Sequence, residues 1–287
     1  MKHMSKLAYL LLSAFALGAC DYVDDPTPPS TGGGVTPGET VKRRALLEEF
    51  TGHRCTTCPA AHIIAANLAN AYGEDLIVVG VHATDFFAAP LDPPAANGSY
   101  STDFRTAAGE TYATTFNVSS LPTGLVNRSP FNSSMTIGSG NWSSAIADIV
   151  DDDAALNMWV DTIIHDGTAN TVSTIVKAAV LQEITGDHNV TVYLTEDHVA
   201  DWQLSSLATP PDVEFYDHRH VLRKNLNGTW GDLAILASAS VGDTLIFNLT
   251  NVPMDPNWNA ANCALVAYVY ELSSNQVLQA TTREFEP

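Results

Sequence analysis

A succession of strand, helix and strand signals around two cysteines restricts the fold of this chain more than any other feature. Residues 44–50 combine apolar and acidic side chains, and residues 76–83 form a continuous apolar run typical of a strand buried on both faces of a parallel sheet. Between them, residues 59–72 have helical periodicity, with proline in the first turn and glycine after the last. Cys55 and Cys58 lie where this helix begins. The order predicts a βαβ unit with two cysteines at its helix start.

Further helix and strand signals follow this unit. After a proline-rich loop at residues 90–98, aromatic and alanine residues recur at helical spacing within residues 104–116. Residues 124–127 predict a short strand, and residues 142–150 predict another helix. Residues 41–153 are therefore expected to form an α/β domain.

The pattern changes after the three aspartates at residues 151–153. From residue 154 to residue 287 the sequence consists of successive short strand signals, separated by Gly, Asn and Asp turns and without helical periodicity. Regular short strands favour an antiparallel β-sandwich. We therefore predict an α/β domain at residues 41–153 followed by an all-β domain at residues 154–287.

The N-terminal sequence predicts an exported lipoprotein. An apolar run follows basic residues and ends in Leu17-Gly18-Ala19-Cys20, the pattern that lipoprotein signal peptidase cleaves. Residues 1–19 are expected to be removed as a signal peptide, and Cys20 is expected to be acylated. Residues 20–40 are rich in Asp, Pro, Thr and Gly, and predict a disordered tether. An ordinary secretory peptide with an incidental cysteine is the alternative.

The composition is strongly acidic, with 32 Asp and Glu against 13 Lys and Arg, for a formal charge of −19. Such a surface repels phosphate backbones and anionic lipid headgroups. We therefore predict no nucleic-acid partner, and attachment to the lipid bilayer through the acyl chains of Cys20. The acidic residues 151–153 lack the spaced ligands of a calcium loop, so we predict no metal ion and no cofactor.

The two neighbouring cysteines have the spacing of a reactive dithiol. In an oxidising envelope, Cys55 and Cys58 are the natural disulfide pair. At a helix start, free backbone N–H groups and the helix dipole stabilise a thiolate, which predicts Cys55 as the nucleophile and Cys58 as the resolving thiol. His53 and Arg54 add positive charge beside Cys55 and are expected to lower its pKa.

Three other interpretations of these cysteines stay open. Cys55, Cys58 and His62 offer three ligands for structural zinc, although no second cysteine pair completes the set. A static disulfide is the second interpretation, but closing so small a loop removes little chain entropy. A vestigial dithiol on a binding domain is the third. Cys263 lies in a separate apolar run and is expected to be a buried core residue.

A basic run at residues 218–223 does not match the strand pattern around it. It contains two histidines and two arginines in an otherwise acidic chain. The run predicts either a solvated loop or an exposed surface that contacts a partner.

The residues around the dithiol resemble the thioredoxin superfamily. The sequence Ser-Leu-Pro-Thr places Pro122 where the family has a cis-proline, and Glu49 lies where it has a buried acid. The resemblance implies that Glu49 exchanges a proton with the second cysteine and that Pro122 shapes a substrate groove. Arg54 replaces the family's tryptophan, and the pair between the cysteines is Thr-Thr, which leaves redox potential and partner choice open.

A closer resemblance covers most of the mature chain. Residues 48–61, together with residues 220–223 and 227–231, are similar to a family of Gram-negative outer-membrane lipoproteins named for a twenty-eight-kilodalton outer-membrane protein. The resemblance implies a thioredoxin-like domain followed by an immunoglobulin-like β-sandwich. It also implies lipid anchoring in the outer membrane, on the periplasmic or the surface-exposed face.

Two functions follow from these patterns. The first is thiol–disulfide exchange, in which Cys55 and Cys58 react with dithiols or disulfides of envelope or surface proteins, as in a thiol–disulfide oxidoreductase. The second is a surface-displayed binding or adhesion lipoprotein whose β-sandwich carries the contact surface. In that case the dithiol is structural or vestigial.

Overall fold

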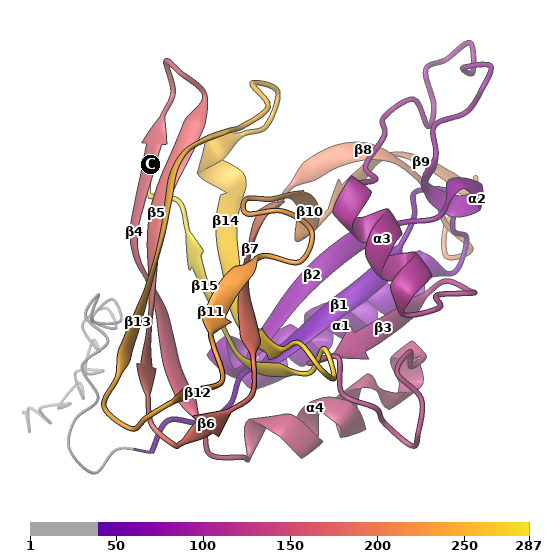
Figure 1. Ribbon diagram of the computed structural model, residues 1–287. Helices are drawn as coiled ribbons and strands as arrows, with labels where there is room; N and C mark the ends of the chain where they lie inside the picture. The colour runs from indigo at the N-terminus through magenta and orange to yellow at the C-terminus, as the bar shows by residue number, and fades with distance from the viewer. Residues whose placement is uncertain (1–39, 287) are drawn as a thin grey trace, which may run out of the picture. The chain divides into compact units, whose positions relative to one another are not determined.

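The computed structural model describes residues 40–286 (Figure 1). The predicted signal peptide, Cys20 and nearly all of the predicted tether lie outside the described residues. The α-helices are α1 Cys58–Tyr72, α2 Asp85–Ala88, α3 Ala107–Thr115 and α4 Trp142–Val150, and the 3-10 helices are η1 Gly73–Asp75, η2 Ser139–Asn141 and η3 Ala260–Asn262. The strands are β1 Ala45–Thr51, β2 Leu76–His82, β3 Thr123–Val126, β4 Leu156–Asp166, β5 Thr171–Val180, β6 Ile184–Thr185, β7 His188–Glu196, β8 Val199–Leu204, β9 Asp212–His218, β10 Val221–Asn225, β11 Asp232–Ile235, β12 Ser238–Ala239, β13 Thr244–Pro253, β14 Cys263–Glu271 and β15 Val277–Glu284.

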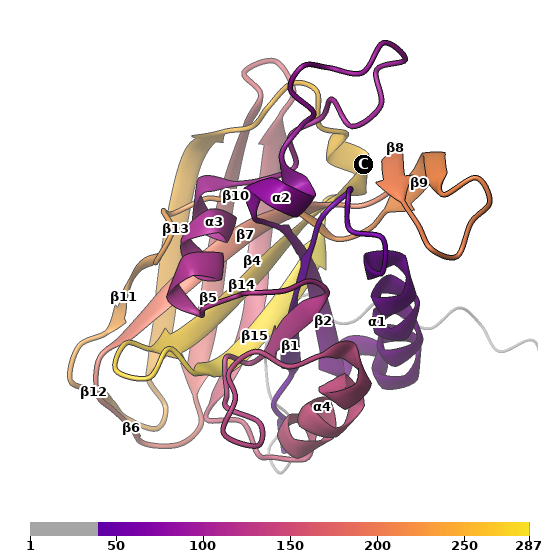
Figure 2. The ribbon, with the colours of Figure 1, turned by 90° about the vertical axis from the view of Figure 1, so that its right-hand side faces the viewer.

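The predicted βαβ unit is present. Strands β1 and β2 pair in parallel along their whole length, and α1 connects them. Strand β3 pairs antiparallel with β1 on its other side. Helices α1 and α4 pack with these strands in one hydrophobic cluster, and α3 packs in a second cluster (Figure 2). The helices predicted around residues 59–72, 104–116 and 142–150 are confirmed.

The same sheet continues into strands from the second half of the chain. Its order is β15-β14-β7-β10-β2-β1-β3, with β11 paired to β7. The junction is parallel pairing between β10 and β2, where Val221 lies opposite Gly80. The Gly80 N–H donates a 2.8 Å hydrogen bond to the carbonyl oxygen of His220. Strands from both sides of residue 153 therefore form one sheet.

The basic run at residues 218–223 divides between two strands and the short turn that joins them. His218 is the last residue of β9 and is buried, and Val221 and Leu222 are buried in β10. Arg219 and His220, between the two strands, keep accessible side chains, as expected for a solvated loop, and Arg223 is partly accessible. Because the apolar residues Val221 and Leu222 directly follow its polar residues, the second half of the run forms strand β10. This strand pairs with β2 and so joins the two parts of the main sheet.

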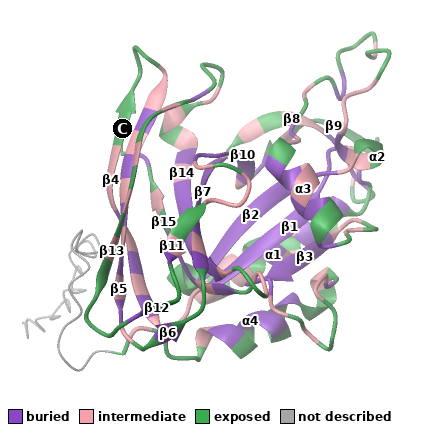
Figure 3. Cartoon of the chain, viewed as in Figure 1, coloured by how far each residue is buried: buried purple, intermediate pink, exposed green. Residues whose placement is uncertain are grey.

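A three-stranded sheet, β13-β5-β4, forms a second layer against the C-terminal part of the main sheet. Side-chain alternation along β14 explains this arrangement. Cys263, Leu265, Ala267 and Val269 belong to the cluster that contains β4 and β5. The residues between them, such as Tyr268, belong to the cluster shared with α3. Figure 3 colours most residues along β7 and β14 as buried, so side chains on both faces of these strands are covered.

The fold is therefore mixed α/β with many strands and few helices, in agreement with the coarse class predicted from the sequence.

Cys263 is buried in the two-layer core as predicted, and burial raises the pKa of its thiol to about 12. Among residues 40–286, none of the helices combines the length and apolar character needed to cross a bilayer.

A fully buried ion pair lies where the two parts of the main sheet meet. Arg128 donates from Nε and Nη2 to the Glu48 carboxylate at 2.7 and 2.8 Å, and both side chains are inaccessible. Arg128 Nη2 also donates to the hydroxyl oxygens of Tyr193 and Tyr268 at 3.0 and 2.9 Å. The guanidinium lies over the ring of Tyr112, 4.5 Å from its centroid. These contacts replace the hydration that both charges lose.

Candidate functional site around the buried disulfide

Cys55 and Cys58 form a disulfide at the start of α1, with their Cα atoms 5.4 Å apart. Cys58 is the first residue of the helix, and its N–H donates to the carbonyl oxygen of Cys55 at 3.3 Å. Cys55 is 1% exposed and Cys58 is 0% exposed. The predicted pairing is present, but the predicted nucleophile is as inaccessible as the predicted resolving thiol.

The hairpin formed by β8 and β9 covers the cysteine turn (Figure 2). The N–H of Leu204, at the end of β8, donates to the carbonyl oxygen of His53 at 2.7 Å. The N–H of Ser206 donates to the carbonyl oxygen of Thr56 at 2.8 Å. Residues 203–206 therefore bond through their backbone to the residues on either side of Cys55. A peptide that adds a strand to the edge of a sheet bonds in the same way.

A buried glutamine reinforces this cover. Gln203 is 0% exposed, and its Nε2 donates to the carbonyl oxygens of Cys55 at 3.1 Å and Gly52 at 3.3 Å. It also donates to the carbonyl oxygen of Leu204 at 2.9 Å. One side chain thus bonds the cysteine turn to the hairpin.

The segment between β2 and α3 holds the hairpin from its other side. The hydroxyl of Tyr100 donates to the Asp212 carboxylate of β9 at 2.7 Å, and the hydroxyl of Thr102 donates to Asp201 of β8. The rings of Tyr100 and Trp202 have centroids 6.1 Å apart. The segment that includes the proline-rich loop therefore holds the hairpin that bonds to the cysteine turn.

Glu49 lies in the middle of β1, between Gly80 of β2 and Gly124 of β3. Its side chain is 3% exposed, and Oε1 has no hydrogen-bond partner. Burial disfavours the ionised carboxylate and raises the pKa of Glu49 to about 8. Glu49 is therefore mostly protonated at neutral pH.

His62 lies one turn after Cys58 and connects Glu49 to the hairpin. Its Nε2 hydrogen-bonds with the Thr51 hydroxyl at 2.8 Å and lies 3.7 Å from Glu49 Oε1. Its Nδ1 hydrogen-bonds with the Tyr216 hydroxyl at 2.6 Å. Burial lowers the pKa of His62 to about 4, so the contact with Glu49 joins two uncharged groups at pH 7.

The residues considered as zinc ligands are thus engaged in other bonds. The sulfurs of Cys55 and Cys58 are joined to each other, and both ring nitrogens of His62 have oxygen partners. The sequence had no signal for the hydroxyl of Tyr216, which lies more than 150 residues away.

Two further buried histidines lie beside this network. His82, the last residue of β2, is 3% exposed, and neither of its ring nitrogens has a hydrogen-bond partner. Its ring centroid lies 5.5 Å from that of His218. His218 Nε2 hydrogen-bonds with the Trp202 carbonyl oxygen at 3.3 Å, while its Nδ1 has no partner. Burial lowers the pKa of both imidazoles, so both are uncharged at neutral pH.

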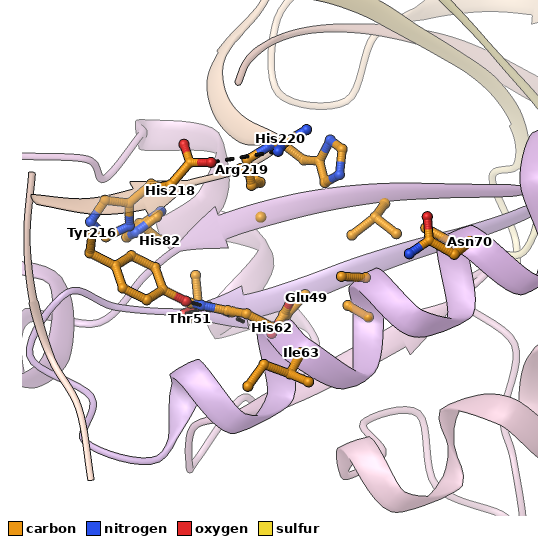
Figure 4. Close-up of a pocket in the computed structure, with 16 residues that line it drawn as sticks. Glu49, Thr51, His62, Ile63, Asn70, His82, Tyr216, His218, Arg219 and His220 are labelled. Carbon is orange, nitrogen blue, oxygen red and sulfur yellow. Dashed lines mark hydrogen bonds and ion pairs between the residues drawn. The ribbon is translucent and has the colours of Figure 1, made fainter. Parts of the chain in front are cut away.

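A cavity of about 500 Å³ opens between α1 and the segment that leads from β9 to β10 (Figure 4). Figure 4 shows Glu49, Thr51, His62 and Tyr216 gathered together and Asn70 farther along the helix. Its lining residues are Glu49, Thr51, His62, Ile63, Ala65, Ala66, Ala69, Asn70, Val78, Gly80, His82, Tyr216, Asp217, His218, Arg219 and His220. Neither cysteine lines the cavity, but the helix that begins at Cys58 forms one of its walls.

The predicted proline lies at the start of β3. The Leu121–Pro122 peptide bond is cis, and the next residue, Thr123, pairs with Phe50 of β1. This register brings Pro122 to the end of β1 from which the cysteine turn continues.

The two residues expected to supply positive charge differ. His53 is 1% exposed and its Nε2 hydrogen-bonds with the carbonyl oxygen of Ala89 at 3.2 Å. Burial lowers the pKa of His53, so its imidazole carries no charge at neutral pH. The Arg54 guanidinium donates from Nη2 to the Asp85 carbonyl oxygen at 2.6 Å. Of the two, only Arg54 places a cation near the cysteine turn.

Gln203, Tyr216 and His218 of the hairpin were not predicted from the sequence as parts of this site. The run at residues 212–218 contains Val, Phe, Tyr and alternating polar residues, a strand signal that was available. For Gln203 there was no such signal, because its partners belong to the cysteine turn.

Comparisons with known proteins give a family and a fold. Residues 109–286 match the sequence model of a family described as outer membrane protein Omp28, a match that begins after the two cysteines. No curated protein sequence matches the chain significantly.

Among solved structures, the chain is similar to HBP35 of Porphyromonas gingivalis, with a TM-score of 0.61, 14% identity, and coverage of 86% of this chain and 76% of that chain. A protein from Agrobacterium tumefaciens gives a TM-score of 0.49 at 10% identity, covering 87% of this chain and 99% of that one. A domain of the outer membrane lipoprotein Omp28 from Porphyromonas gingivalis gives a TM-score of 0.29 at 20% identity, covering 47% and 90%. The first of these shows a shared fold.

Proposed function

The chain belongs to the outer membrane protein Omp28 family, and from this premise we propose that it carries out thiol–disulfide exchange at the outer membrane through Cys55 and Cys58. Family membership confirms the outer-membrane localisation predicted from the sequence. Acylation of Cys20, which lies outside the described residues, supplies the lipid anchor in this proposal.

One observation carries the redox part of the proposal: the disulfide lies at the N-terminus of helix α1, and the buried carboxylic acid Glu49 contacts His62 one turn along the same helix. Helix α1 places the positive end of its dipole where a Cys thiolate forms on reduction, while the N–H groups of Cys58 and Ala60 donate to the carbonyl oxygens of Cys55 and Thr57. Glu49, with its raised pKa, holds a proton at neutral pH that a departing thiolate can accept. A static disulfide requires neither feature.

The arrangement of elements supports a thioredoxin-like segment at residues 41–153. Parallel β1 and β2 joined by α1, followed by antiparallel β3 after Pro122, is the order implied by the resemblance. The two packed sheets at residues 154–287 support an immunoglobulin-like sandwich for the second segment. In this proposal the two segments share the strand junction between β2 and β10.

The exchange proceeds in two balanced steps. A thiolate of a partner dithiol attacks Cys55 Sγ, the bond between Cys55 and Cys58 breaks, and Cys58 leaves as a thiolate that takes a proton from Glu49. The second partner thiolate then attacks the partner sulfur of the mixed disulfide and releases Cys55 as a thiolate, which takes up the second proton. The two partner thiols release their protons to solvent as they become thiolates, and solvent returns one proton to Glu49 and supplies the one that Cys55 takes up. Overall the partner loses two electrons and two protons, and the protein gains them. The reverse sequence oxidises a partner.

Access to the disulfide controls this chemistry. Residues 203–206 occupy the side of the cysteine turn that a partner peptide would pair with, and both sulfurs are buried beneath them. Exchange therefore requires this segment to detach, a local opening that leaves the sheet core intact.

The reduction potential of the disulfide tests the proposal. Equilibration of the protein with defined dithiothreitol buffers is expected to give a potential above about −300 mV, the value below which structural disulfides typically lie. A Cys58→Ser variant is expected to capture envelope proteins as mixed disulfides with Cys55, and a Cys55→Ser/Cys58→Ser control is expected to capture none. A reduction potential well below that value, together with a Cys58→Ser variant that captures no partner protein, would reject thiol–disulfide exchange.

The burial of the disulfide favours a second candidate function, a surface-displayed binding lipoprotein with a structural disulfide. Under this candidate, the Cys55→Ser/Cys58→Ser variant fully complements a deletion strain. Under thiol–disulfide exchange, the same variant is displayed and folded but fails to complement.

A further inference from the structure

The cavity beside α1 has one apolar wall and one polar wall. Ile63, Ala66 and Ala69 of α1 and Val78 of β2 provide apolar surface. Polar groups line the opposite side, from Glu49 through His82 to the β9–β10 segment (Figure 4). Ligand sites commonly combine an apolar body with a few convergent polar groups in this way.

Several polar atoms that face this cavity are buried and unpaired. Glu49 Oε1, both ring nitrogens of His82 and Nδ1 of His218 have no hydrogen-bond partner, and the three residues are at most 4% exposed. Unpaired buried polar atoms cost free energy, and native proteins keep few of them. They mark a place where a ligand can supply the missing bonds.

The basic side chains at the rim of the cavity are already engaged with acidic partners. Arg219 at the rim lies 3.3 Å from Asp197 and 3.5 Å from Asp217, and the His220 ring lies 3.2 Å from Asp197. The remaining titratable groups that face Glu49 are His62, His82, His218 and Tyr216, all shifted by burial towards their uncharged forms. Within residues 40–286, none of these groups brings a positive charge to the Glu49 carboxyl.

We propose that this cavity binds a primary ammonium group attached to an apolar chain, with the ammonium on the Glu49 carboxylate and the chain along α1. Glu49 accepts one N–H and is ionised by the bound cation. The unprotonated nitrogen of the neutral His82 ring and Nδ1 of the neutral His218 ring, whose Nε2 bonds to the Trp202 carbonyl oxygen, are acceptors for the others. The formal charge of −19 favours the approach of a cation over that of an anion.

The site predicts a specific pH dependence. In the empty cavity Glu49 is mostly protonated below pH 8, so an ammonium must displace that proton to bind. Affinity is therefore expected to fall about tenfold for each pH unit below about 8, and to level off above it. A neutral ligand of the same shape has no such dependence.

Isothermal titration calorimetry with 3-phenylpropylamine and its neutral isostere 3-phenylpropan-1-ol tests the proposal on the full chain in detergent. The amine is expected to bind at least tenfold more tightly than the alcohol at pH 8, with the pH dependence given above. Glu49→Gln is expected to remove this preference in the same detergent. The matched control Glu74→Gln, an exposed acid of η1 outside the cavity, is expected to keep it.

A cavity-filling variant makes the test independent of Glu49. Ala66 is exposed at the cavity wall on α1, so Ala66→Phe is expected to weaken the amine and the alcohol alike without unfolding the protein. Equal affinity of amine and alcohol, a pH-independent amine affinity, or a Glu49→Gln variant that still prefers the amine each overturns the proposal.

A further arm identifies the source of the ammonium. Nα-acetyl-lysine methylamide presents the same group as a protein side chain. Tighter binding of this compound than of 3-phenylpropylamine assigns the cavity to a lysine of a partner protein, and the opposite order assigns it to a free amine. Neither arm depends on the redox activity of the disulfide, so the proposal stands or falls separately from thiol–disulfide exchange.

Discussion

The side chain of Gln203 donates a 3.1 Å hydrogen bond to the carbonyl oxygen of Cys55, although 148 residues separate them in the sequence. This bond joins the hairpin to the residue that the sequence marks as the nucleophile. The reactivity of the disulfide is therefore tied to the stability of the hairpin, as well as to the chemistry of the cysteines.

Replacement of this glutamine is expected to expose the disulfide. Gln203→Ala removes three hydrogen bonds from one buried side chain, and a loss of about 1.4 kcal/mol of local stability raises the open population about tenfold. We expect reduction by tris(2-carboxyethyl)phosphine to accelerate at least tenfold, measured by thiol titration. Gln182→Ala, at a site remote from the cysteine turn, is the control, and equal rates in both variants would contradict the gating role.

The stability of the protein is expected to depend on pH through Glu49. Its pKa is about 8 in the folded state and near 4.5 in the unfolded chain, so the folded state binds the extra proton between these values. The stabilising contribution of Glu49 to the free energy of unfolding is complete below about pH 4.5. It is lost as pH rises towards 8, by up to about 1.4 kcal/mol per pH unit.

Comparison with Glu49→Gln isolates this effect. Urea unfolding at pH 5 to 9 is expected to show the variant gaining stability relative to the native protein as pH rises, with the difference constant above about pH 8. His62 and His218, whose lowered pKa values act in the opposite sense below pH 6.5, change both proteins equally. A difference that does not vary with pH would show that Glu49 is ionised in the folded state.

The buried ion pair between Glu48 and Arg128 is expected to be intolerant of partial removal. Glu48→Gln leaves the guanidinium charge buried with neutral partners and no compensating negative charge, which is expected to cost about 3–5 kcal/mol in urea unfolding. The more exposed contact between Asp103 and Arg105 is the control, and Asp103→Asn is expected to cost less than about 1 kcal/mol.

A double variant separates the charge effect from general disruption. Glu48→Met/Arg128→Met removes both charges and keeps apolar volume among the surrounding aromatic rings, so it is expected to be more stable than Glu48→Gln alone. A double variant with a lower free energy of unfolding than Glu48→Gln would contradict this expectation. It would mean that the ion pair stabilises the protein by more than the cancellation of two buried charges.

Membrane attachment is expected to depend on Cys20. Cys20→Ala removes the acylation site, and the protein is expected to move from the outer-membrane fraction to the soluble fraction in cell fractionation with immunoblotting. Cys263→Ala, at a buried thiol, is the matched control and is expected to stay in the membrane fraction. A Cys20→Ala protein that remains in the membrane would place the anchor elsewhere.

Local patterns in the sequence were sufficient for the elements around the dithiol. The apolar stripe between Pro59 and Tyr72 predicted α1, and the apolar run after it predicted β2, because helix and strand periodicity depend on residues a few positions apart. The same holds for the burial of Cys263, which follows from the apolar residues on either side of it.

The environment of the dithiol was not contained in such patterns. The sequence placed Cys55 and Cys58 at a helix start and marked Glu49 as an acid beside them, and it suggested a cysteine open to partners. Only the tertiary structure brought Gln203 onto the cysteine turn, Tyr216 onto His62, and the run at residues 218–223 into the junction of the main sheet. These contacts join segments more than 130 residues apart through single hydrogen bonds and one short parallel pairing. Periodicity in a sequence records which face of an element is buried, whereas the identity of the segment that buries it is decided by packing of the whole chain.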